Sequence, residues 1–239
     1  MKRKLDFGTD TYSMAFKAVN YDSYEQLDLS PRNQALAFFG STFVFLLQIS
    51  LIFFVLSFVQ DDPDFNLVCP KDLSVLATRF IATIMMHLGV EADIRQGLLM
   101  MKFVTYHPDQ FQFPFIAFII GLCQLFGGFA SEIMCIIFLS SLNNVIDCLI
   151  RFMAFGMIAK IDNFYADALC GDNKITGDTE PFEVTVNRRN VDKCEFSCLM
   201  KFCRWVYKFL RVMYCSYIFY FMPFTAIFLP YLLTIDTSS

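Results

Sequence analysis

The sequence predicts an all-α fold, a polytopic transmembrane helical bundle of about five spans. Hydrophobic residues make up 56% of the 239 residues and charged residues only 18%, and the mean hydropathy is +0.49. An ordinary globular domain is about half apolar and a quarter charged. The apolar residues also occur in long continuous runs, and Lys and Arg gather in the segments between some of these runs. Long apolar runs with an asymmetric basic distribution are typical of multi-pass membrane proteins.

The first span is expected at residues 36–59, because an apolar run of 24 residues is long enough to cross a hydrocarbon core of about 30 Å. The sequence Asp61-Asp62-Pro63-Asp64 marks its end, since three carboxylates and a proline do not continue into lipid. The run at 113–141 is equally apolar and predicts a second clear span.

A third clear span is expected at the C-terminal end of the chain, at residues 206–235. Pro223 and Pro230 lie inside this run and are expected to kink the helix, because proline removes a backbone hydrogen bond and its ring clashes with the preceding turn.

Two further segments, 73–92 and 143–160, are apolar but contain ionisable side chains. We expect both to be buried within a helical bundle, because their polarity is unsuited to a position surrounded by lipid. An alternative is that they are re-entrant or interfacial and that only three segments span. The membrane bundle occupies 36–161 and 206–235 in the first interpretation.

The distribution of basic residues predicts a cytoplasmic N-terminus. With five spans, 16 of the 19 Lys and Arg residues fall in segments predicted to be cytoplasmic, whereas three spans place 15 there and four outside. Both arrangements put the N-terminal segment 1–35 and the loop 162–205, with its basic juxtamembrane helix, in the cytoplasm. Both put the tail 236–239 on the other side. Charge alone does not choose between them.

Ionisable residues at membrane depth are the first candidates for function, because a charge there is costly and usually faces a bundle interior, a partner subunit or a water path. Asp147 and Arg151 stand four apart and are expected to share a helix face, where they can form an ion pair. Glu132 has no nearby basic residue in sequence, so Arg79 is its expected partner. An ion pathway and a partner contact are the alternatives for these four residues.

Small residues in the run 113–141 predict close helix packing. Gly127 and Ser131 form a small-xxx-small pair, with Gly121 and Gly128 nearby, and such residues let helix backbones approach closely. Packing inside the protein is favoured over an oligomer interface.

The cysteines do not predict a metal site. Cys194, Cys198 and Cys203 lack a CxxC pair and a nearby histidine, whereas structural zinc requires four ligands and usually tight pairs. They lie beside a basic cluster at a membrane edge, so S-acylation is an alternative to unmodified thiols. The basic cluster predicts contact with anionic lipid and consists of Lys201, Arg204, Lys208 and Arg211.

The sequence contains no catalytic or cofactor motif, so we expect a protein that is not an enzyme and has no cofactor. Neither G-x-S-x-G nor a Cys/His context for a nucleophile occurs, and no phosphate-binding glycine loop is present. His87 and His107 are the only histidines, and hydrogen-bonded structural roles are expected for both. The net charge of -4 argues against a nucleic-acid partner.

The stretch Lys160 to Leu169, KIDNFYADAL, carries two carboxylates five residues apart, Asp162 and Asp167. Together with the preceding run 143–158 it resembles segments of uncharacterised multi-pass membrane proteins of protists such as ciliates. The resemblance covers a tenth to a quarter of the chain and implies no known activity. A helix end leaving the membrane is the favoured interpretation of this stretch, and a cation-attracting mouth beneath a pore is the alternative.

The favoured hypothesis is a multi-pass integral membrane subunit of an oligomeric ion-conducting assembly. A non-catalytic structural or accessory subunit of a larger membrane complex, in a homo- or hetero-oligomer, is the alternative. The acidic balance and the absence of an Arg- and Ser-rich transit sequence favour the plasma membrane or an endomembrane over the mitochondrial inner membrane.

Overall fold

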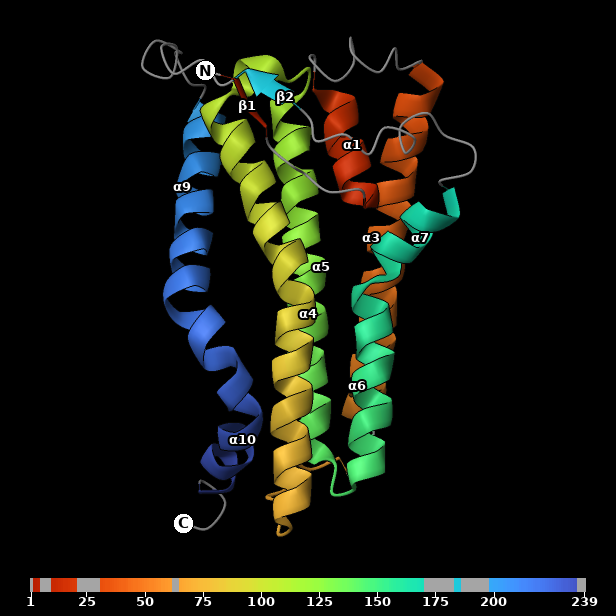
Figure 1. Cartoon of the computed structure of the whole chain (residues 1–239), viewed down its shortest axis with the longest axis vertical. Helices are drawn as coiled ribbons and strands as arrows, with labels where there is room; N and C mark the ends of the chain where they lie inside the picture. The colour runs from red at the N-terminus through yellow and green to blue at the C-terminus, as the bar shows by residue number, and fades with distance from the viewer. Residues whose placement is uncertain are drawn as a thin grey trace. The chain divides into compact units, whose positions relative to one another are not determined.

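The computed structural model describes residues 2–4, 10–20, 31–61, 65–169, 183–185 and 198–235, and these are almost entirely helical (Figure 1). The elements in chain order are β1 (Lys2–Lys4), α1 (Thr11–Val19), α3 (Pro31–Asp61), α4 (Leu73–Tyr106), the 3-10 helix η1 (Pro108–Gln110), α5 (Pro114–Ser141), α6 (Val145–Ala159), α7 (Ile161–Leu169), β2 (Glu183–Thr185), α9 (Cys198–Met213), the π-helical turn η2 (Tyr214–Ile218) and α10 (Phe219–Ile235). Strands β1 and β2 pair antiparallel, with Arg3 opposite Val184. Most of the predicted loop 162–205 and the tail 236–239 lie outside the described residues.

Three helices are long and apolar enough to cross a membrane, which confirms the prediction of an apolar helical fold. They are α4, with 34 residues, α5, with 28, and the 24-residue stretch Gln34–Ser57 of α3. At 1.5 Å per residue α4 is about 51 Å long, so it extends beyond a hydrocarbon core of about 30 Å. The predicted segment 73–92 is therefore the first part of a longer helix.

Helix α6 is shorter than the predicted segment 143–160. Its 15 residues give a length of about 22 Å, less than a hydrocarbon core requires. Asn144 caps its N-terminus by accepting a hydrogen bond from the Ile146 N–H at 3.0 Å. The count of five spans and the side of the N-terminus stay predictions.

The C-terminal apolar run is broken. The chain bends by 62° between Cys198–Ser216 and Phe219–Tyr231, and this pair adds a fourth span only if it is taken as one broken span. The bend coincides with η2, one turn before Pro223. Because proline cannot donate to the carbonyl four residues earlier and its ring clashes there, the distortion falls on the turn that precedes it.

The chain forms two compact units, and each is described by itself below. Unit 1 comprises residues 1–46, 93–126 and 161–211, and unit 2 comprises residues 47–92, 127–160 and 212–239.

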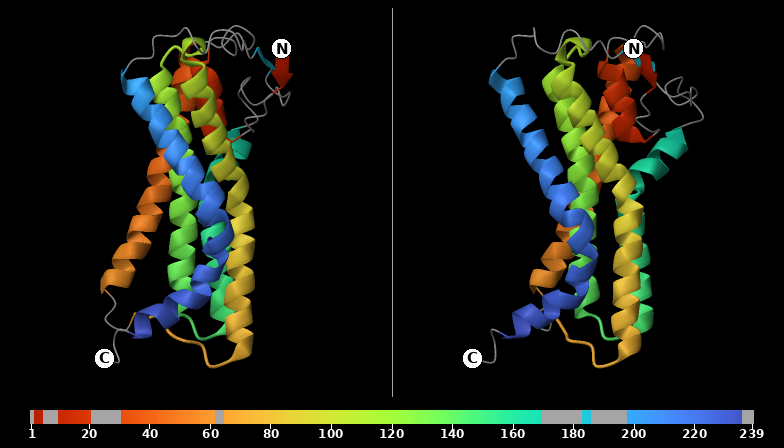
Figure 2. Two further views of the ribbon diagram at one scale, coloured as in Figure 1. Left: turned by 90° about the vertical axis from the view of Figure 1, so that its left-hand side faces the viewer. Right: turned by 60° about the vertical axis from the view of Figure 1, so that its left-hand side comes forward.

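In unit 1 the second part of α4 and the first part of α5 lie side by side (Figure 2). The contact depends on two glycines. A Cβ atom at Gly97 would lie 2.7 Å from the Gly121 carbonyl oxygen and 3.0 Å from the Leu125 nitrogen, and one at Gly121 would lie 3.0 Å from the Gly97 carbonyl oxygen. Since no side chain fits there, Gly121 packs helices together inside this chain, with Gly97 as its counterpart.

Helix α1 packs on α7 in the same unit. Met14 and Ala18 of α1 form a buried cluster with Ala166 of α7, and Ala37 of α3 lies against it. The ring of Phe16 lies 5.1 Å from that of Phe111, centroid to centroid. The segment 10–20 is therefore folded into unit 1 and is more than the polar N-terminal segment that the sequence predicted.

In unit 2, Gly127 makes room for a buried glutamine of α3. Gln48 is 2% exposed and donates from Nε2 to the Ile158 carbonyl of α6 at 3.3 Å. A Cβ atom at Gly127 would lie 3.0 Å from Gln48 Cδ, so a larger residue would displace this amide. Ser131 donates from Oγ to the Gly127 carbonyl at 2.9 Å, and Gly128 is buried.

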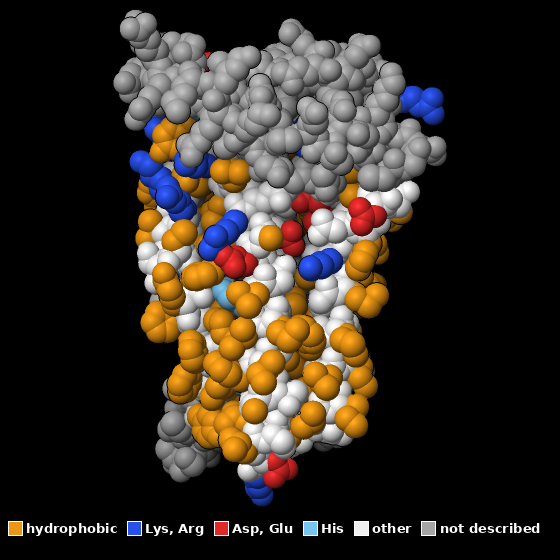
Figure 3. Space-filling model, viewed as in Figure 1, with side chains coloured by type: hydrophobic (Ala, Val, Ile, Leu, Met, Phe, Trp, Pro, Cys, Tyr) orange, Lys and Arg blue, Asp and Glu red, His pale blue; other side chains and the backbone are white. Residues whose placement is uncertain are grey.

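The outer surface of the unit 2 helices is apolar. Large hydrophobic side chains of α4 and α6 are more than 45% exposed, and Figure 3 shows such side chains gathered over the described surface. These residues are Leu73, Ile81, Met85, Leu88, Ile146, Leu149, Ile150, Met153 and Met157. A surface of this kind is stable in contact with lipid or with another apolar protein surface.

Candidate functional site: a buried carboxylate cluster

Three aspartates from distant parts of the sequence meet inside unit 1. Asp10 precedes α1, Asp93 lies in α4 and Asp162 lies in the first turn of α7, and one carboxylate oxygen from each lies within 4.8 Å of the other two. They are 3%, 9% and 2% exposed. We refer to these three residues as the carboxylate cluster.

The position of Asp10 is fixed by helix capping and by two glutamines. Its side chain accepts a hydrogen bond from the Ser13 N–H at 2.6 Å, as expected for an N-cap residue. Its Oδ2 accepts from Gln96 Nε2 at 2.7 Å and from Gln124 Nε2 at 2.8 Å. The amides of α4 and α5 therefore hold this carboxylate at the cluster.

The electrostatics of the cluster favour the neutral acids. Burial raises the pKa of Asp10 above its ordinary value, although the hydrogen bonds from Ser13 and Gln96 oppose the shift. Burial, with added repulsion from Asp10 and Asp93, raises the pKa of Asp162 from 3.8 to about 8. Burial and the nearby Asp162 likewise raise the pKa of Tyr12, which is 2% exposed. The positive charge of Lys17 also opposes the shift of Asp10, but three buried acids so close together still favour neutralisation by a proton or a cation.

Several buried oxygen atoms at the cluster have no hydrogen-bond donor among the described residues. Oδ1 of Asp162, Oε1 of Gln124 and Oγ of Thr11 are buried in this way. Gln124 is held at the cluster by its bond to Asp10, and Thr11 follows Asp10 in sequence. Since buried polar atoms are almost always satisfied, these oxygens are open to a further partner such as a proton, a water molecule or a cation.

The donor set fits a hard divalent cation. Calcium takes six to eight oxygen ligands at about 2.3–2.6 Å, so oxygens on opposite sides of the ion are separated by roughly 4.8 Å. The three carboxylate oxygens lie within that separation of one another. The amide oxygen of Gln124 and the hydroxyl of Thr11 are ligands of the same type. The cluster could thus bind Ca²⁺. It could bind a smaller cation that prefers oxygen ligands if the three carboxylates moved closer together.

Sequence reasoning identified only one member of this cluster. Asp162 belongs to the stretch Lys160 to Leu169, but its partner in sequence, Asp167, is exposed and is not a member. A usable signal existed for Asp10, because an Asp before a short apolar periodic stretch is typical of a helix N-cap. The proximity of Asp93 follows from the packing of α4 alone.

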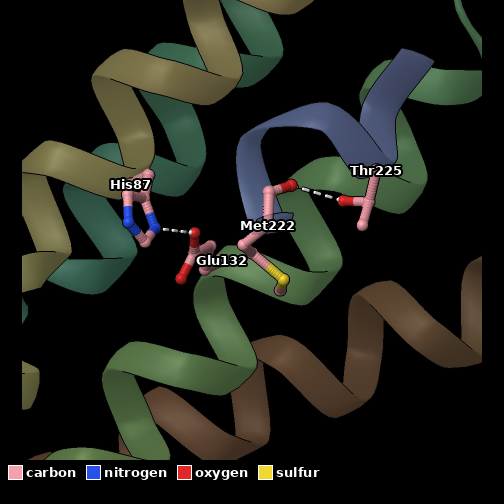
Figure 4. A network of polar contacts seen from close by, with 4 residues as sticks. All are labelled: His87, Glu132, Met222 and Thr225. Atoms are coloured by element: carbon pink, nitrogen blue, oxygen red, sulfur yellow. Dashed lines mark hydrogen bonds and ion pairs between the residues drawn. The ribbon is translucent and has the colours of Figure 1, made fainter. Parts of the chain in front are cut away.

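In unit 2, Glu132 of α5 pairs with His87 of α4. The prediction that Arg79 is the partner of Glu132 is therefore wrong. His87 Nδ1 and Glu132 Oε1 are 2.6 Å apart, and the two residues are 3% and 0% exposed. Figure 4 shows the pair beside α10, where Thr225 donates from Oγ1 to the Met222 carbonyl at 2.6 Å. The ring of Phe219 lies 5.5 Å from the His87 ring. A histidine 45 residues away was not an obvious partner, because sequence does not give the register between helices.

The side chain of Arg79 instead donates hydrogen bonds to backbone carbonyls, one of them just after the C-terminus of α5. Its Nε donates to the Leu142 carbonyl at 3.0 Å and its Nη1 to the Val68 carbonyl at 2.9 Å, and the residue is 0% exposed. Carbonyls at a helix C-terminus lack intrahelical donors and carry partial negative charge. The guanidinium is therefore stabilised without a carboxylate.

Double-mutant cycles should distinguish these two arrangements. We expect His87→Phe and Glu132→Leu to be coupled by at least about 1 kcal/mol in unfolding free energy, because they share one buried bond. The matched cycle of Arg79→Met with Glu132→Leu should be additive within about 0.5 kcal/mol. Unfolding in detergent measures both, and equal coupling in the two cycles would contradict the observed pairing.

The predicted ion pair between Asp147 and Arg151 is absent from α6, a helix that the structure describes in full. Both are exposed. Asp147 lies in the first turn of α6, where the helix dipole favours a carboxylate, and the Arg151 guanidinium lies 5.3 Å from the centre of the Phe138 ring. Each residue therefore has a local stabilising contact of its own.

The candidate acylation sites differ in accessibility. Cys198 is exposed, Cys203 is buried at 2% exposure, and Cys194 lies outside the described residues. A buried thiol is not presented to an acyl donor, so within α9 the structure leaves Cys198 as the accessible candidate.

No family model, curated protein or solved structure matches this chain.

Proposed function

We propose that this protein is a multi-pass integral membrane subunit of an oligomeric ion-conducting assembly, and that the carboxylate cluster binds a divalent cation in it. The observation that carries the proposal is the meeting of Asp10, Asp93 and Asp162 within 4.8 Å in a buried site. Bringing three acids together is costly unless protons or a cation compensate, so their presence favours a ligand-binding role.

The membrane part of the proposal is supported by the three long apolar helices and the apolar outer surface of unit 2. The position of Asp93 in α4 supports a link between the cation and the membrane. This residue follows the apolar segment 73–90 of the same helix, so a bound cation would contact a helix that is long enough to cross the bilayer.

The oligomeric part is supported by α6. Asp147 and Arg151 are exposed on a helix whose other exposed residues are apolar. Exposed charges on an apolar helix face are costly in lipid and are favourable against a partner subunit or water. Glu132 and Arg79 are buried and bonded to partners within the chain, so they do not support a pore lining.

The first test is direct cation binding by the purified protein after treatment with a chelator. We expect Ca²⁺ to bind, and each of Asp10→Asn, Asp93→Asn and Asp162→Asn to weaken binding by at least about ten-fold, because each removes a charged ligand. The matched control is Asp167→Asn on the same helix, which should leave affinity unchanged. Calorimetry in detergent with Ca²⁺, Mg²⁺ and Mn²⁺ measures the unaltered protein and the four variants. Binding that is absent, or equally weakened by the control, would contradict the proposal.

The second test is ion flux in liposomes that contain the purified protein. An ion-conducting assembly should dissipate a cation gradient across the liposome membrane. The three Asp→Asn variants of the carboxylate cluster should change the rate of cation flux, and Asp167→Asn should not. Cation binding without flux would support the second candidate, an accessory subunit whose fold is stabilised by the cation. That candidate is favoured by the contacts that join His87 to Glu132 and Arg79 to backbone carbonyls within the chain.

A further inference from the structure

Helix α9 has three distinct faces: one is buried, one is basic and one carries exposed aromatic rings. Met200, Cys203 and Tyr207 are spaced by three and four residues and are at most 6% exposed. A second row, one position further along, is basic and comprises Lys201, Arg204, Lys208 and Arg211. A third row, one position further again, is aromatic and comprises Phe202, Trp205 and Phe209.

The aromatic row is exposed and ordered as a stack. Phe202, Trp205 and Phe209 are 61%, 63% and 52% exposed. The ring centroids of Phe202 and Trp205 lie 6.4 Å apart, and those of Trp205 and Phe209 lie 5.8 Å apart with nearly parallel planes. Three large rings in one row form an apolar stripe that is unfavourable in water.

The basic row divides into residues used by the protein and residues that face outward. Arg204 lies with its Cζ atom 4.3 Å from the centre of the Tyr106 ring, and Arg211 donates from Nη1 to the Tyr207 hydroxyl at 3.4 Å. Lys201 and Lys208 are exposed, seven residues apart on the same face. The outward charge of this face is therefore positive.

We propose that the aromatic stripe of α9 inserts among lipid acyl chains at the edge of the bilayer and that its two exposed lysines contact anionic lipid headgroups. Tryptophan and phenylalanine beside lysine and arginine are typical of helix segments at a membrane interface. Charge complementarity selects anionic lipid, because each lysine near an anionic leaflet contributes about 1 kcal/mol, a factor of about five in affinity. The inference depends on the apolar spanning helices and is independent of cation binding at the carboxylate cluster.

Four basic residues in sixteen argue against the alternative that α9 crosses the hydrocarbon core as half of a broken span. Charged side chains at the bilayer centre cost at least a few kcal/mol each, whereas long basic side chains near the interface reach the headgroups.

The experiment uses Trp205, the one tryptophan of the chain, as a local probe. The full-length protein is placed in mixed bilayers of phosphatidylcholine and phosphatidylglycerol. One of the two lipids is brominated at a time, either near the headgroup or near the acyl-chain end. We expect Trp205 fluorescence to be quenched mainly by the shallow bromines. Brominated phosphatidylglycerol should quench more than brominated phosphatidylcholine at low salt, and 0.5 M salt should remove that difference, because screening weakens surface contacts.

The matched variants carry the same change of charge in different places. Lys201→Gln with Lys208→Gln should lower the preference for phosphatidylglycerol by up to about 25-fold, and Lys71→Gln with Lys160→Gln should leave it unchanged. Stronger quenching by the deep bromines would overturn the inference in favour of a span. Absence of quenching by either lipid would overturn it in favour of a protein partner on the aromatic stripe. Equal quenching by the two headgroup types in the unaltered protein would also overturn it.

Discussion

Gly97→Leu is expected to destabilise the protein by more than about 3 kcal/mol, the largest effect we predict for a single substitution. A Cβ atom at this position would lie 2.7 Å from the Gly121 carbonyl oxygen, and both atoms belong to rigid helix backbones. Overpacking typically costs 1–3 kcal/mol even where side chains can adjust, and backbone atoms adjust less. Gly121→Leu should have a similar effect, because its Cβ atom would lie 3.0 Å from the Gly97 carbonyl oxygen.

The measurement is the unfolding midpoint in detergent by circular dichroism, with size-exclusion chromatography to detect misfolded protein. Gly89→Ala and Gly156→Ala are the controls, because a Cβ atom at either glycine would meet nothing within 4 Å. These changes should be neutral or stabilising by up to about 1 kcal/mol, since alanine is the better helix former. A similar loss of stability in both groups would show that the close approach of α4 and α5 is not the cause.

The second large effect concerns pH in protein that has been freed of divalent cations. The pKa of Asp162 is about 8 in the folded chain against 3.8 ordinarily. The folded state therefore binds a proton more tightly than the unfolded state does. The contribution of Asp162 to the free energy of unfolding is fully present below about pH 4. It is lost as the pH rises through about 8, by up to about 1.4 kcal/mol per pH unit.

Unfolding by denaturant between pH 5 and pH 9 in a chelator measures this loss. Asp162→Asn should flatten the dependence, because asparagine does not ionise, and the exposed Asp167→Asn should leave it unaltered. If the proposed function is correct, added Ca²⁺ should restore stability most strongly near pH 8, where the carboxylates are free to bind it. A dependence that is unchanged in Asp162→Asn would contradict the buried position of this acid.

The positions of the long helices could be predicted from sequence because hydropathy is a local property. The runs at 36–59 and 113–141 each contain enough apolar residues to cross lipid, and the structure has helices there. The segment 73–92 was less clear, since it contains Arg79 and His87. The helical pattern of the sequence runs on from this segment through Ile94 to Phe103, and the helix of the structure ends close by, at Tyr106.

The partners of the buried charges were not predictable in the same way. Charge alone favoured Arg79 for Glu132, but the structure gives His87 to Glu132 and gives backbone carbonyls to Arg79. The choice depends on the register of α4 against α5, which varies continuously with helix rotation and translation. A search for a lysine or arginine partner also passes over histidines and backbone carbonyls.

The sequence by itself determined that this chain is rich in long apolar helices, because the bilayer imposes a length and a polarity that can be read residue by residue. Tertiary structure alone decided where its acidic chemistry lies. Asp93 lies 83 residues after Asp10, and Asp162 lies 69 residues after Asp93. Each is an ordinary residue within its own segment. They meet because α1, α4 and α7 pack together, and packing between helices depends on shape that no local pattern encodes.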